Sequence, residues 1–395
     1  MLPGIWKSIN EPENLQSMAA AGQRKRLRVE SLGWCGAVVA ALCGASAPAD
    51  TPARPATECR LRIVCFNAEN LAAPGERTRV TRFRFEPARR RHIDRVAAVL
   101  ETLAADIVVL PEVVSRESVD AVAELLRDKG LGGYRGWHVE GSDAFTGFDV
   151  ALLSRIEPDE VDGQRIRILV PEKRKHGSEQ RKQGAAAARA AADEWLREPY
   201  VVRDASGAEE REEAVLQRHA LACFTVCGRR LGVLGLHLKS NPSDPAANAQ
   251  RTAETRIARD IIRREIVARG YLPIVLGDLN DYDPDVPMAD GVRKTQTTVL
   301  GDLKDFDPER PGPELVNAAA FMPRVADRYT SHWDFNENGA ADGDDVFTMI
   351  DHILVPRELE PALVRAFICH ATDLDVSDHF PVIVDLDLSR SPAAP

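Results

Sequence analysis

The feature that most constrains the fold is an apolar segment at residues 274–281, IVLGDLND, which ends abruptly in glycine and polar side chains. Its apolar residues are typical of a buried β-strand, and a strand that stops in this way carries its last side chains to one edge of a sheet. Asp278 and Asn280 are two positions apart, so they point to the same side if the strand geometry persists. A carboxylate and an amide on one face suit a phosphate group held with a metal ion. An ordinary Asx-rich turn after a strand would give the same sequence.

Strand and helix patterns alternate along the rest of the chain. Residues 60–71 and 106–113 have the character of strands, and the apolar spacing of residues 91–103 and 118–127 is helical. Further strands are predicted at residues 134–139, 148–153, 220–226, 230–238, 328–333, 348–355 and 376–388, and a further helix at residues 250–268. This alternation predicts an α/β fold. A chain of 395 residues with 44% hydrophobic residues can form one large domain of this class.

Polar residues of the types that bind metal or phosphate stand at the ends of five predicted strands. They are Asn67 with Glu69, Glu112, His237, Asp278 with Asn280, and Asp378 with His379. Asp351 is predicted to lie within a sixth strand, where an ionised carboxylate is costly unless it is paired. In α/β sheets the active crevice lies beyond the strand ends. Oxygen ligands dominate this set, so a hard ion such as Mg²⁺, Mn²⁺ or Ca²⁺ is favoured over zinc.

The segments FNAENL, LPEV, GLHLKS, GDLND, MIDHIL and SDHFPV follow one another in the chain. In this order they resemble the motif series of the endonuclease/exonuclease/phosphatase superfamily, which includes nucleases, phosphatases and lipid phosphodiesterases such as sphingomyelinases. The match extends over about residues 61–388. Each motif alone is weak, but GDxN followed by SDH is specific. The resemblance implies a four-layer α/β sandwich, in which two packed mixed β-sheets are flanked by helices, and metal-dependent hydrolysis of a phosphate ester.

The resemblance also implies a role for each polar strand end. The residues implied to bind metal are Glu112, as the principal ligand, with Glu69, Asp378 and Asp278. His379 would be the general base that activates water, and Asp351 would fix its tautomer. Asn67, Asp278 and Asn280 would hold the phosphate and orient the nucleophile. His237 would stabilise the charge of the transition state, although a histidine at this position can also simply cap a hairpin.

The aromatic or arginine residue that usually holds the phosphate in this family is not apparent in the sequence. Tyr134 and Arg155 are the candidates for this role.

A second metal-binding pattern occupies residues 334–345, DFNENGAADGDD. It matches the calcium loop of EF-hand type, with ligands supplied by Asp334, Asn336, Asn338, Asp342 and Asp345. In this chain the segment connects two predicted strands rather than two helices. The sequence therefore leaves a structural Ca²⁺ site and a plain acidic turn both open.

The N-terminal residues 1–47 follow the plan of a secretory signal peptide. Basic residues at 24–28 precede an apolar run at residues 32–45 and an A-x-A cleavage site that ends at Ala47. The run is too short to span a bilayer, and Met18 would give a signal of conventional length if it were the true initiator. The alternative is a buried N-terminal helix. We predict a secreted or periplasmic protein without a transmembrane anchor after cleavage.

The mature chain is predicted to be a linker at residues 48–59 followed by one domain at residues 60–390. A surface insertion at about residues 157–216 holds a basic run at residues 172–182, an alanine-rich helix at about residues 184–197 and the acidic segment AEEREEA. We interpret the basic run as a solvated loop, although it could also follow a nucleic-acid backbone.

Charge and cysteine content bear on the partners. Without residues 1–47, which carry five basic and three acidic side chains, the formal charge of −10 becomes −12. Such an acidic chain is no general nucleic-acid coat, so a nuclease would need a local basic crevice. The residues that could supply it are Arg82, Arg84, Arg89, Arg90, Arg91 and the basic run. The five remaining cysteines predict one or two disulfides and a free thiol, with the pairing undetermined.

The sequence thus predicts a secreted, Mg²⁺- or Mn²⁺-dependent phosphodiesterase, in the first place a nuclease, that acts as a monomer on nucleic acid. The alternative among enzymes is a phosphatase or a lipid phosphodiesterase that acts on a small phosphoester or a lipid head group. The alternative from another class is a catalytically inactive binding module. The presence of both His379 and Asp278 argues against that last hypothesis.

Overall fold

The computed structural model describes residues 59–76, 86–171, 193–203, 206–288, 295, 297–336, 338–339 and 341–390. The predicted signal segment, the linker up to residue 58 and the basic run at residues 172–182 lie outside the described residues.

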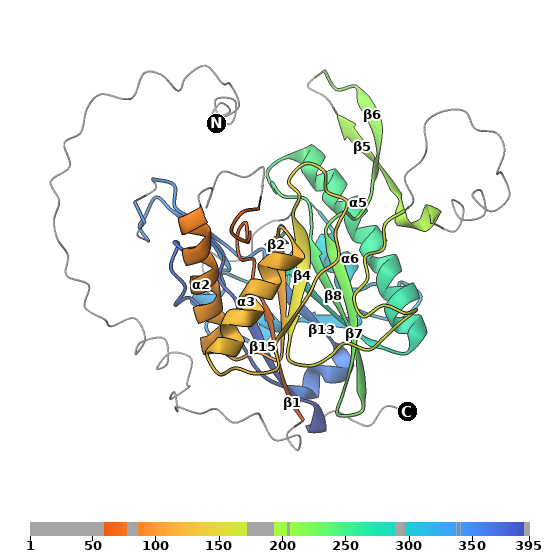
Figure 1. Cartoon of the computed structure of the whole chain (residues 1–395). Coiled ribbons are helices and arrows are strands. Elements are labelled where there is room, and N and C mark those ends of the chain that lie inside the picture. The colour runs from red at the N-terminus through yellow and green to blue at the C-terminus, as the bar shows by residue number, and fades with distance from the viewer. Residues whose placement is uncertain are drawn as a thin grey trace, which may run out of the picture.

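Two mixed β-sheets lie at the centre of the molecule (Figure 1). The first comprises β1 (Arg60–Cys65), β2 (Ile107–Val113), β3 (Arg135–Trp137), β4 (Asp149–Ser154), β14 (Leu363–Ile368) and β15 (Val382–Asp387). Its strand order is β14-β15-β1-β2-β4-β3, and β1 and β2 are parallel. The second comprises β7 (His219–Val226), β8 (Arg229–His237), β9 (Leu272–Asp278), β10 (Leu315–Asn317) and β13 (Asp351–Pro356). Its order is β10-β13-β9-β8-β7, and β8 and β9 are parallel.

Two hairpins stand outside these sheets. They are formed by β5 (Glu198–Arg203) with β6 (Glu209–Ala214), and by β11 (Ser331–Trp333) with β12 (Val346–Thr348). The first hairpin packs on the helix that covers the second sheet. The second is joined to the segment before β15 by a bridge between Ser331 and His379.

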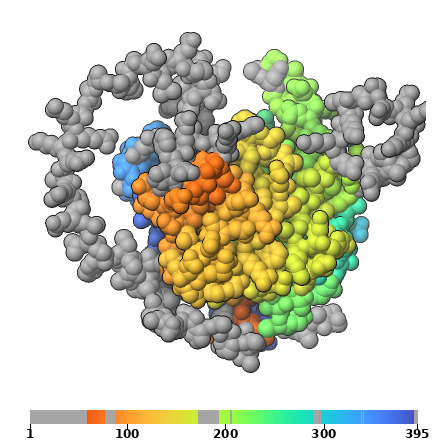
Figure 2. Space-filling view, in the orientation of Figure 1, coloured from red at the N-terminus to blue at the C-terminus, as the bar shows by residue number. Residues whose placement is uncertain are grey.

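Helices cover the outer face of each sheet. The first sheet packs against α2 (Glu86–Leu103) and α3 (Arg116–Asp128), and the second against α5 (Pro245–Ile261) and α6 (Val299–Lys304). In the space-filling view, the orange-to-yellow residues of α2, α3 and the strands after them form the face turned to the viewer (Figure 2). Two sheets between two helical layers make up the predicted four-layer sandwich. None of the described helices combines the length and the apolar composition that crossing a bilayer requires.

Short helical segments complete the described chain. The 3₁₀ segments are Glu194–Leu196, Val267–Arg269, Ala318–Phe321, Val325–Asp327, Arg357–Ala362 and Leu388–Arg390, and Ile262–Ile266 forms one π-helical turn.

Apolar residues on both faces of each strand build three core layers. In β1, Leu61, Ile63 and Cys65 face the second sheet, whereas Val64 faces α2. The predicted inner face of α2, with Val96 among its residues, is fully buried in that outer layer. Strands that are buried on both faces lack the alternation of half-exposed strands, which is why the sequence shows them as continuous apolar runs.

Gly277 shows how closely the two parallel strands β8 and β9 approach each other. Its φ is 151°, and a Cβ atom at this position would lie 1.8 Å from the carbonyl oxygen of Leu236. Only glycine fits, and this close approach sets Asp278 directly beside His237.

The structure corrects several sequence predictions. The strand predicted at residues 348–355 is broken into β12 and β13, so Asp351 begins a strand instead of lying inside one. The helix predicted at residues 250–268 begins at Pro245, because Asp244 caps it, and its regular part ends at Ile261. The acidic segment of the predicted insertion, for which no secondary structure was predicted, forms β6. Of the alanine-rich segment only residues 193–197 are described, and they form a 3₁₀ turn rather than an α-helix.

One disulfide joins Cys59, at the start of β1, to Cys227, in the β7–β8 turn, with 5.7 Å between the Cα atoms. It links the edges of the two sheets. The other described cysteines, Cys65, Cys223 and Cys369, are free and buried.

Candidate active site

The strand directions bring the predicted polar residues to one edge of the sandwich. β1 and β2 are parallel, so the residues after β1 and the end of β2 lie together, which places Asn67 near Glu112. In the second sheet His237 pairs with Asp278, and Asp351 pairs with Asp278 from the other side. The two sheets meet through Asn67, whose Nδ2 donates to Glu112 Oε1 and to Asp278 Oδ2, each at 3.2 Å. Residues from distant parts of the chain thus form one pocket.

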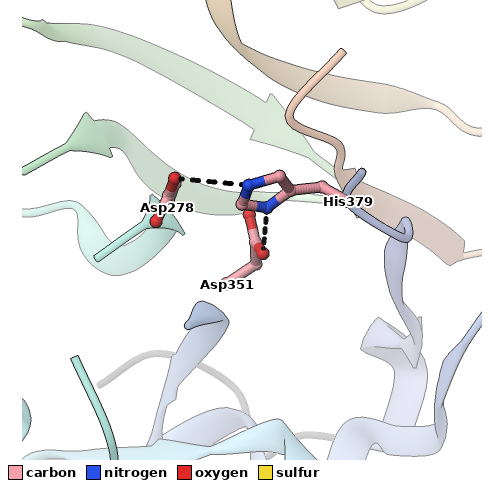
Figure 3. A group of neighbouring side chains, drawn as sticks. All are labelled: Asp278, Asp351 and His379. Atoms are coloured by element: carbon pink, nitrogen blue, oxygen red, sulfur yellow. Dashed lines mark hydrogen bonds and ion pairs between the residues drawn. The ribbon is translucent and has the colours of Figure 1, made fainter. Parts of the chain in front are cut away.

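His379 lies between two carboxylates. Its Nδ1 is 2.7 Å from Asp351 Oδ2, and its Nε2 is 3.9 Å from Asp278 Oδ2 (Figure 3). Burial lowers the pKa of His379, but the charge and hydrogen bond of Asp351, with Asp378 and Asp278, outweigh it and raise this pKa well above its usual value. Burial raises the pKa of Asp278 to about 7, and the neighbouring Asp351 adds to the rise. Both groups therefore bind a proton more tightly than the free side chains do.

His237 faces the pocket from the end of β8. Its Nε2 lies 3.9 Å from Glu112 Oε1 and 3.7 Å from Asp278 Oδ2, and its buried Nδ1 has no hydrogen-bond partner among the described residues. Burial lowers its pKa well below the usual value, with further contributions from Arg218 and His379. His237 is therefore neutral at physiological pH. A buried imidazole without a close partner is suited to a ligand rather than to capping a hairpin.

The other predicted site residues lie at the rim of the pocket. Glu69 accepts the backbone N–H of Asp378 at 3.1 Å, so this carboxylate is turned toward the rim. Asp378 is the most exposed member, with 41% of its side chain accessible, and its Oδ1 lies 4.0 Å from His379 Nε2. Asn280 donates its amide to the carbonyl of Leu238 at 3.1 Å. The side-chain oxygen of Asn280 takes no part in this bond.

Left-handed backbone conformations gather at the same place. Glu69, Asn70, Glu112 and Asn280 have φ angles of 48°, 56°, 60° and 52°. At Glu112 this conformation coincides with a register shift between β2 and β4, a bulge that turns the carboxylate from the sheet toward Asn67. Non-glycine residues in this region are strained, and such strain concentrates at functional sites.

The acidic groups fit a hard divalent cation. Burial raises the pKa of Glu112, and the charge of Asp378 adds to the rise. Asp278, Asp351 and His379 each offer a ligand atom within 4.8 Å of the others, and Oδ1 of Asp351 is buried without a hydrogen-bond partner among the described residues. Converging carboxylates are costly unless a positive charge offsets them. Glu112 and Asp278 face the pocket, and Asp378 and Glu69 lie at its rim. Metal binding by these four residues stays a prediction.

Two predicted phosphate-binding residues lie elsewhere, and their assignment is wrong. β4 is antiparallel to β2, so Arg155, which follows β4, lies beside Asp106 at the end of β2 opposite Glu112. The Tyr134 hydroxyl is buried and donates to the carbonyl of Ala105 at 2.5 Å. Asp106 and Glu112 are six residues apart along β2, so roughly 20 Å separates Tyr134 and Arg155 from the pocket. Arg89, one of the predicted crevice residues, is also buried and donates to the carbonyls of Ala73 and Glu76.

Two hydroxyl groups that position backbone segments of the site were not predicted from the sequence. Ser377 donates to the carbonyl of Asn67 at 2.7 Å and accepts the N–H of His379 at 3.0 Å. Thr330 Oγ1 accepts the N–H groups of Ile350 and Asp351 at 3.0 Å, at the break between β12 and β13. The position of Ser377 within the SDH motif was the available signal; Thr330 had none.

The predicted calcium loop forms the turn of the β11–β12 hairpin. Asp334 accepts the N–H groups of Asn338 and Gly339, and Asn336 and Asn338 both donate their amides to Asp342 Oδ2. Asp345 Oδ2 is 2.7 Å from His332 Nε2. The five predicted ligands lie in one turn. Calcium binding by them stays a prediction.

Comparison with known proteins agrees with this arrangement. The profile described as "Endonuclease/Exonuclease/phosphatase family" matches residues 65–379. No curated protein matches the sequence. Similar solved structures include D. rerio TDP2 complexed with single-strand DNA product (15% identity, covering 82% of this chain and 98% of that chain, TM-score 0.45). They also include a 3′-5′ exonuclease (NExo) from Neisseria meningitidis (18%, 83% and 100%, 0.46) and a family protein from Leptotrichia buccalis (12%, 82% and 98%, 0.48). Because the profile extends from Cys65 to His379 and spans every strand end that forms the pocket, the chain belongs to the endonuclease/exonuclease/phosphatase family of phosphoester hydrolases.

Proposed function

We propose that this protein is an exported, divalent-metal-dependent phosphodiesterase that cleaves nucleic acid. The observation that carries the proposal is the orientation of His379. Its Nδ1 is fixed by Asp351 at 2.7 Å, and its Nε2 is directed toward the carboxylate of Asp278 in the pocket that Asn67 and Glu112 complete.

His379 acts as the general base. With the proton of Nδ1 held by Asp351, the lone pair of Nε2 faces the pocket and takes a proton from a water molecule. The oxygen of that water bonds to phosphorus while the bond from phosphorus to the leaving oxygen breaks. The imidazolium that forms is stabilised by the charge of Asp351.

The remaining residues bind and orient the phosphate. Glu112 and Asp278 would hold a divalent cation such as Mg²⁺ or Mn²⁺, which would supply positive charge to the phosphoryl oxygens. Neutral His237 donates its Nε2–H to an oxygen that gains charge as phosphorus is attacked, because this nitrogen faces the pocket, 3.7 Å from Asp278 Oδ2 and 3.9 Å from Glu112 Oε1. Asn67 keeps Glu112 and Asp278 at a fixed separation.

Two observations support export. The N-terminal residues 1–47 have the composition of a signal peptide. The chain has a disulfide between Cys59 and Cys227, and disulfides form and persist in oxidising compartments.

A substrate panel tests the proposal. Purified protein is assayed with Mg²⁺, Mn²⁺, Ca²⁺ or EDTA against single-stranded DNA, plasmid DNA, RNA, bis-p-nitrophenyl phosphate, p-nitrophenyl phosphate and sphingomyelin. We expect metal-dependent cleavage of nucleic acid and of the synthetic diester, and loss of both in His379→Ala. The matched control is His370→Gln, because the hydrogen bond of His370 goes to the carbonyl of Tyr329 and not to a residue of the pocket. Cleavage of the monoester alone, or of sphingomyelin alone, would reject the nuclease in favour of the phosphatase or the lipid phosphodiesterase.

A further inference from the structure

Asn280, which lies directly after β9, has a left-handed backbone conformation with a φ angle of 52°. Its side-chain amide donates to the carbonyl of Leu238, so the loop after β9 and the loop after β8 meet at the pocket. A strained conformation of a non-glycine residue persists only where the surrounding structure holds it. The contacts that hold these two loops therefore determine how Asn280 faces the pocket.

Arg251 of α5 joins the two loops. Its Nε lies 3.0 Å from Oδ2 of Asp281, the residue after Asn280, and its Nη1 donates to the carbonyl of Lys239 at 2.9 Å. Lys239 in turn follows Leu238, whose carbonyl accepts the Asn280 amide. One guanidinium thus binds the residue that follows Asn280 and the residue that follows the hydrogen-bond partner of Asn280.

Asp281 has further contacts that fix the loop after β9. Its Oδ1 accepts the hydroxyl of Thr295 at 2.6 Å, and its Oδ2 accepts the hydroxyl of Thr297. Its backbone carbonyl lies 2.9 Å from Nε2 of His352, the residue after Asp351 at the start of β13. Asp281 therefore connects the loop after β9 both to α5 and to the strand that begins with Asp351.

The ion pair between Arg251 and Asp281 is closed to solvent, with 0% and 2% of the two side chains exposed. A buried pair with several further hydrogen bonds has a fixed geometry, because a shift of either group would leave a buried charge or donor unmatched. Stability alone does not require such a pair, since well-packed apolar side chains of similar volume often stabilise a fold as well or better. The position that the pair imposes on the two loops is the better explanation for it.

We propose that Arg251 and Asp281 are positioning residues, which hold Asn280 in the arrangement that hydrolysis requires. This assignment rests on the proposed phosphodiesterase function, in which Asn280 holds the substrate phosphate. Neither residue of the pair touches the substrate, because both side chains are closed to solvent. Their effect on the reaction passes through Asn280, whose neighbour in the chain is Asp281.

A double-mutant cycle tests the assignment. With bis-p-nitrophenyl phosphate and Mg²⁺, Arg251→Met should lower kcat/KM about 10- to 100-fold, the scale for a displaced catalytic geometry. In the Asn280→Ala background the same change should lower kcat/KM less than about threefold, because the residue through which Arg251 acts is already lost.

A second variant separates position from stability. Arg251→Met combined with Asp281→Asn removes both buried charges, so its thermal unfolding midpoint should exceed that of Arg251→Met, whereas its kcat/KM should stay as low. The control is Arg167→Met, since Arg167 is also largely buried and lies 2.8 Å from Glu265, which follows α5. It should lower the midpoint and change kcat/KM less than about threefold.

The outcomes separate this assignment from the proposed function. If Arg251→Met lowers kcat/KM by the same factor with and without Asn280, the assignment is overturned and the function stands. Recovery of both the midpoint and the rate in the doubly neutral variant would also overturn it, because the pair would then serve stability alone. If the wild-type protein hydrolyses only p-nitrophenyl phosphate, the phosphodiesterase function fails, and the same cycle measured on that monoester decides the role of Arg251.

Discussion

Replacement of Asp351 by asparagine tests the central contact of the site. The change keeps the shape of the side chain and removes its charge, and the bond at stake is the 2.7 Å contact between Asp351 Oδ2 and His379 Nδ1. A charge-assisted bond of this kind is worth about 1.5–3 kcal/mol, against about 1 kcal/mol for a neutral one. If the asparagine NH₂ faces Nδ1, the ring must carry its proton on Nε2 and cannot act as a base. We therefore expect kcat to fall about 10²- to 10⁴-fold, the range for loss of general-base catalysis.

The same variant should change the pH dependence in a defined direction. Asp351 raises the pKa of His379, so its loss lowers that pKa. A general base works only when it is unprotonated, so the acid limb of the kcat/KM profile depends on this group. In Asp351→Asn the acid limb should therefore move to lower pH, while the plateau is much lower.

The assay is hydrolysis of bis-p-nitrophenyl phosphate across pH and across Mg²⁺ concentration. Asp106→Asn is the control, because Asp106 is another buried carboxylate, and it accepts the N–H of Arg62 at 2.7 Å at the end of β2 opposite Glu112. It should alter kcat less than about threefold, as Asp106 lies at the far edge of the sheet. The reasoning is refuted if high Mg²⁺ restores the full rate of Asp351→Asn, because Asp351 would then be a metal ligand rather than the partner of His379.

Three further predictions concern stability and metal binding. Burial lowers the pKa of His219 to about 4, so as pH falls from 6.5 toward 4 the unfolded chain gains a proton that the folded chain excludes. The wild-type protein should therefore lose about 2 kcal/mol more stability than His219→Gln between pH 7 and 5 in urea unfolding, and parallel curves would contradict this. Reduction of the disulfide between Cys59 and Cys227, 168 residues apart, should lower the free energy of unfolding by about 3–5 kcal/mol, and an unchanged urea midpoint would argue against the pairing. If the acidic loop binds Ca²⁺, Tb³⁺ luminescence excited through Trp333 should appear in the wild-type protein, be competed by Ca²⁺ and vanish in Asp334→Ala; no luminescence in the wild-type protein would leave the loop a plain acidic turn.

The polar strand ends could be predicted because buried strands and the functional residues that follow them have different sequence patterns. A strand buried on both faces is a continuous apolar run, and a polar residue directly after it must be exposed, paired or functional. This argument located Glu112, Asp278 and His379, and the structure places all three in one pocket. It needs only the positions of strand ends, which apolar runs define well.

Strand direction is what the sequence could not supply. Arg155 follows an apolar run just as Asn280 does, but β4 is antiparallel to β2, so its end lies at the far edge of the sheet. Arg218 directly precedes β7. Because β7 and β8 are antiparallel, the start of β7 lies beside the end of β8, and the carbonyl of Arg218 accepts the N–H of His237 there. Until the strand pairing is known, a residue before a strand and a residue after a strand are equally good candidates for the pocket edge of the sheet.

The backbone of the site departs from the rules that predict the rest of the chain. The apolar neighbours of Glu112 predict that it lies inside a strand, yet it adopts a left-handed backbone conformation at a bulge. Asn280 adopts the same conformation directly after β9. In regular strand geometry Glu112 would point toward the helical layer, as its neighbours Leu110 and Val113 do, and Asn67 could not reach it. Local propensity cannot favour such a conformation for glutamate. The pocket therefore exists where local preference and the global fold disagree, and that disagreement is itself a sign that this edge of the sheet is selected for chemistry rather than for stability.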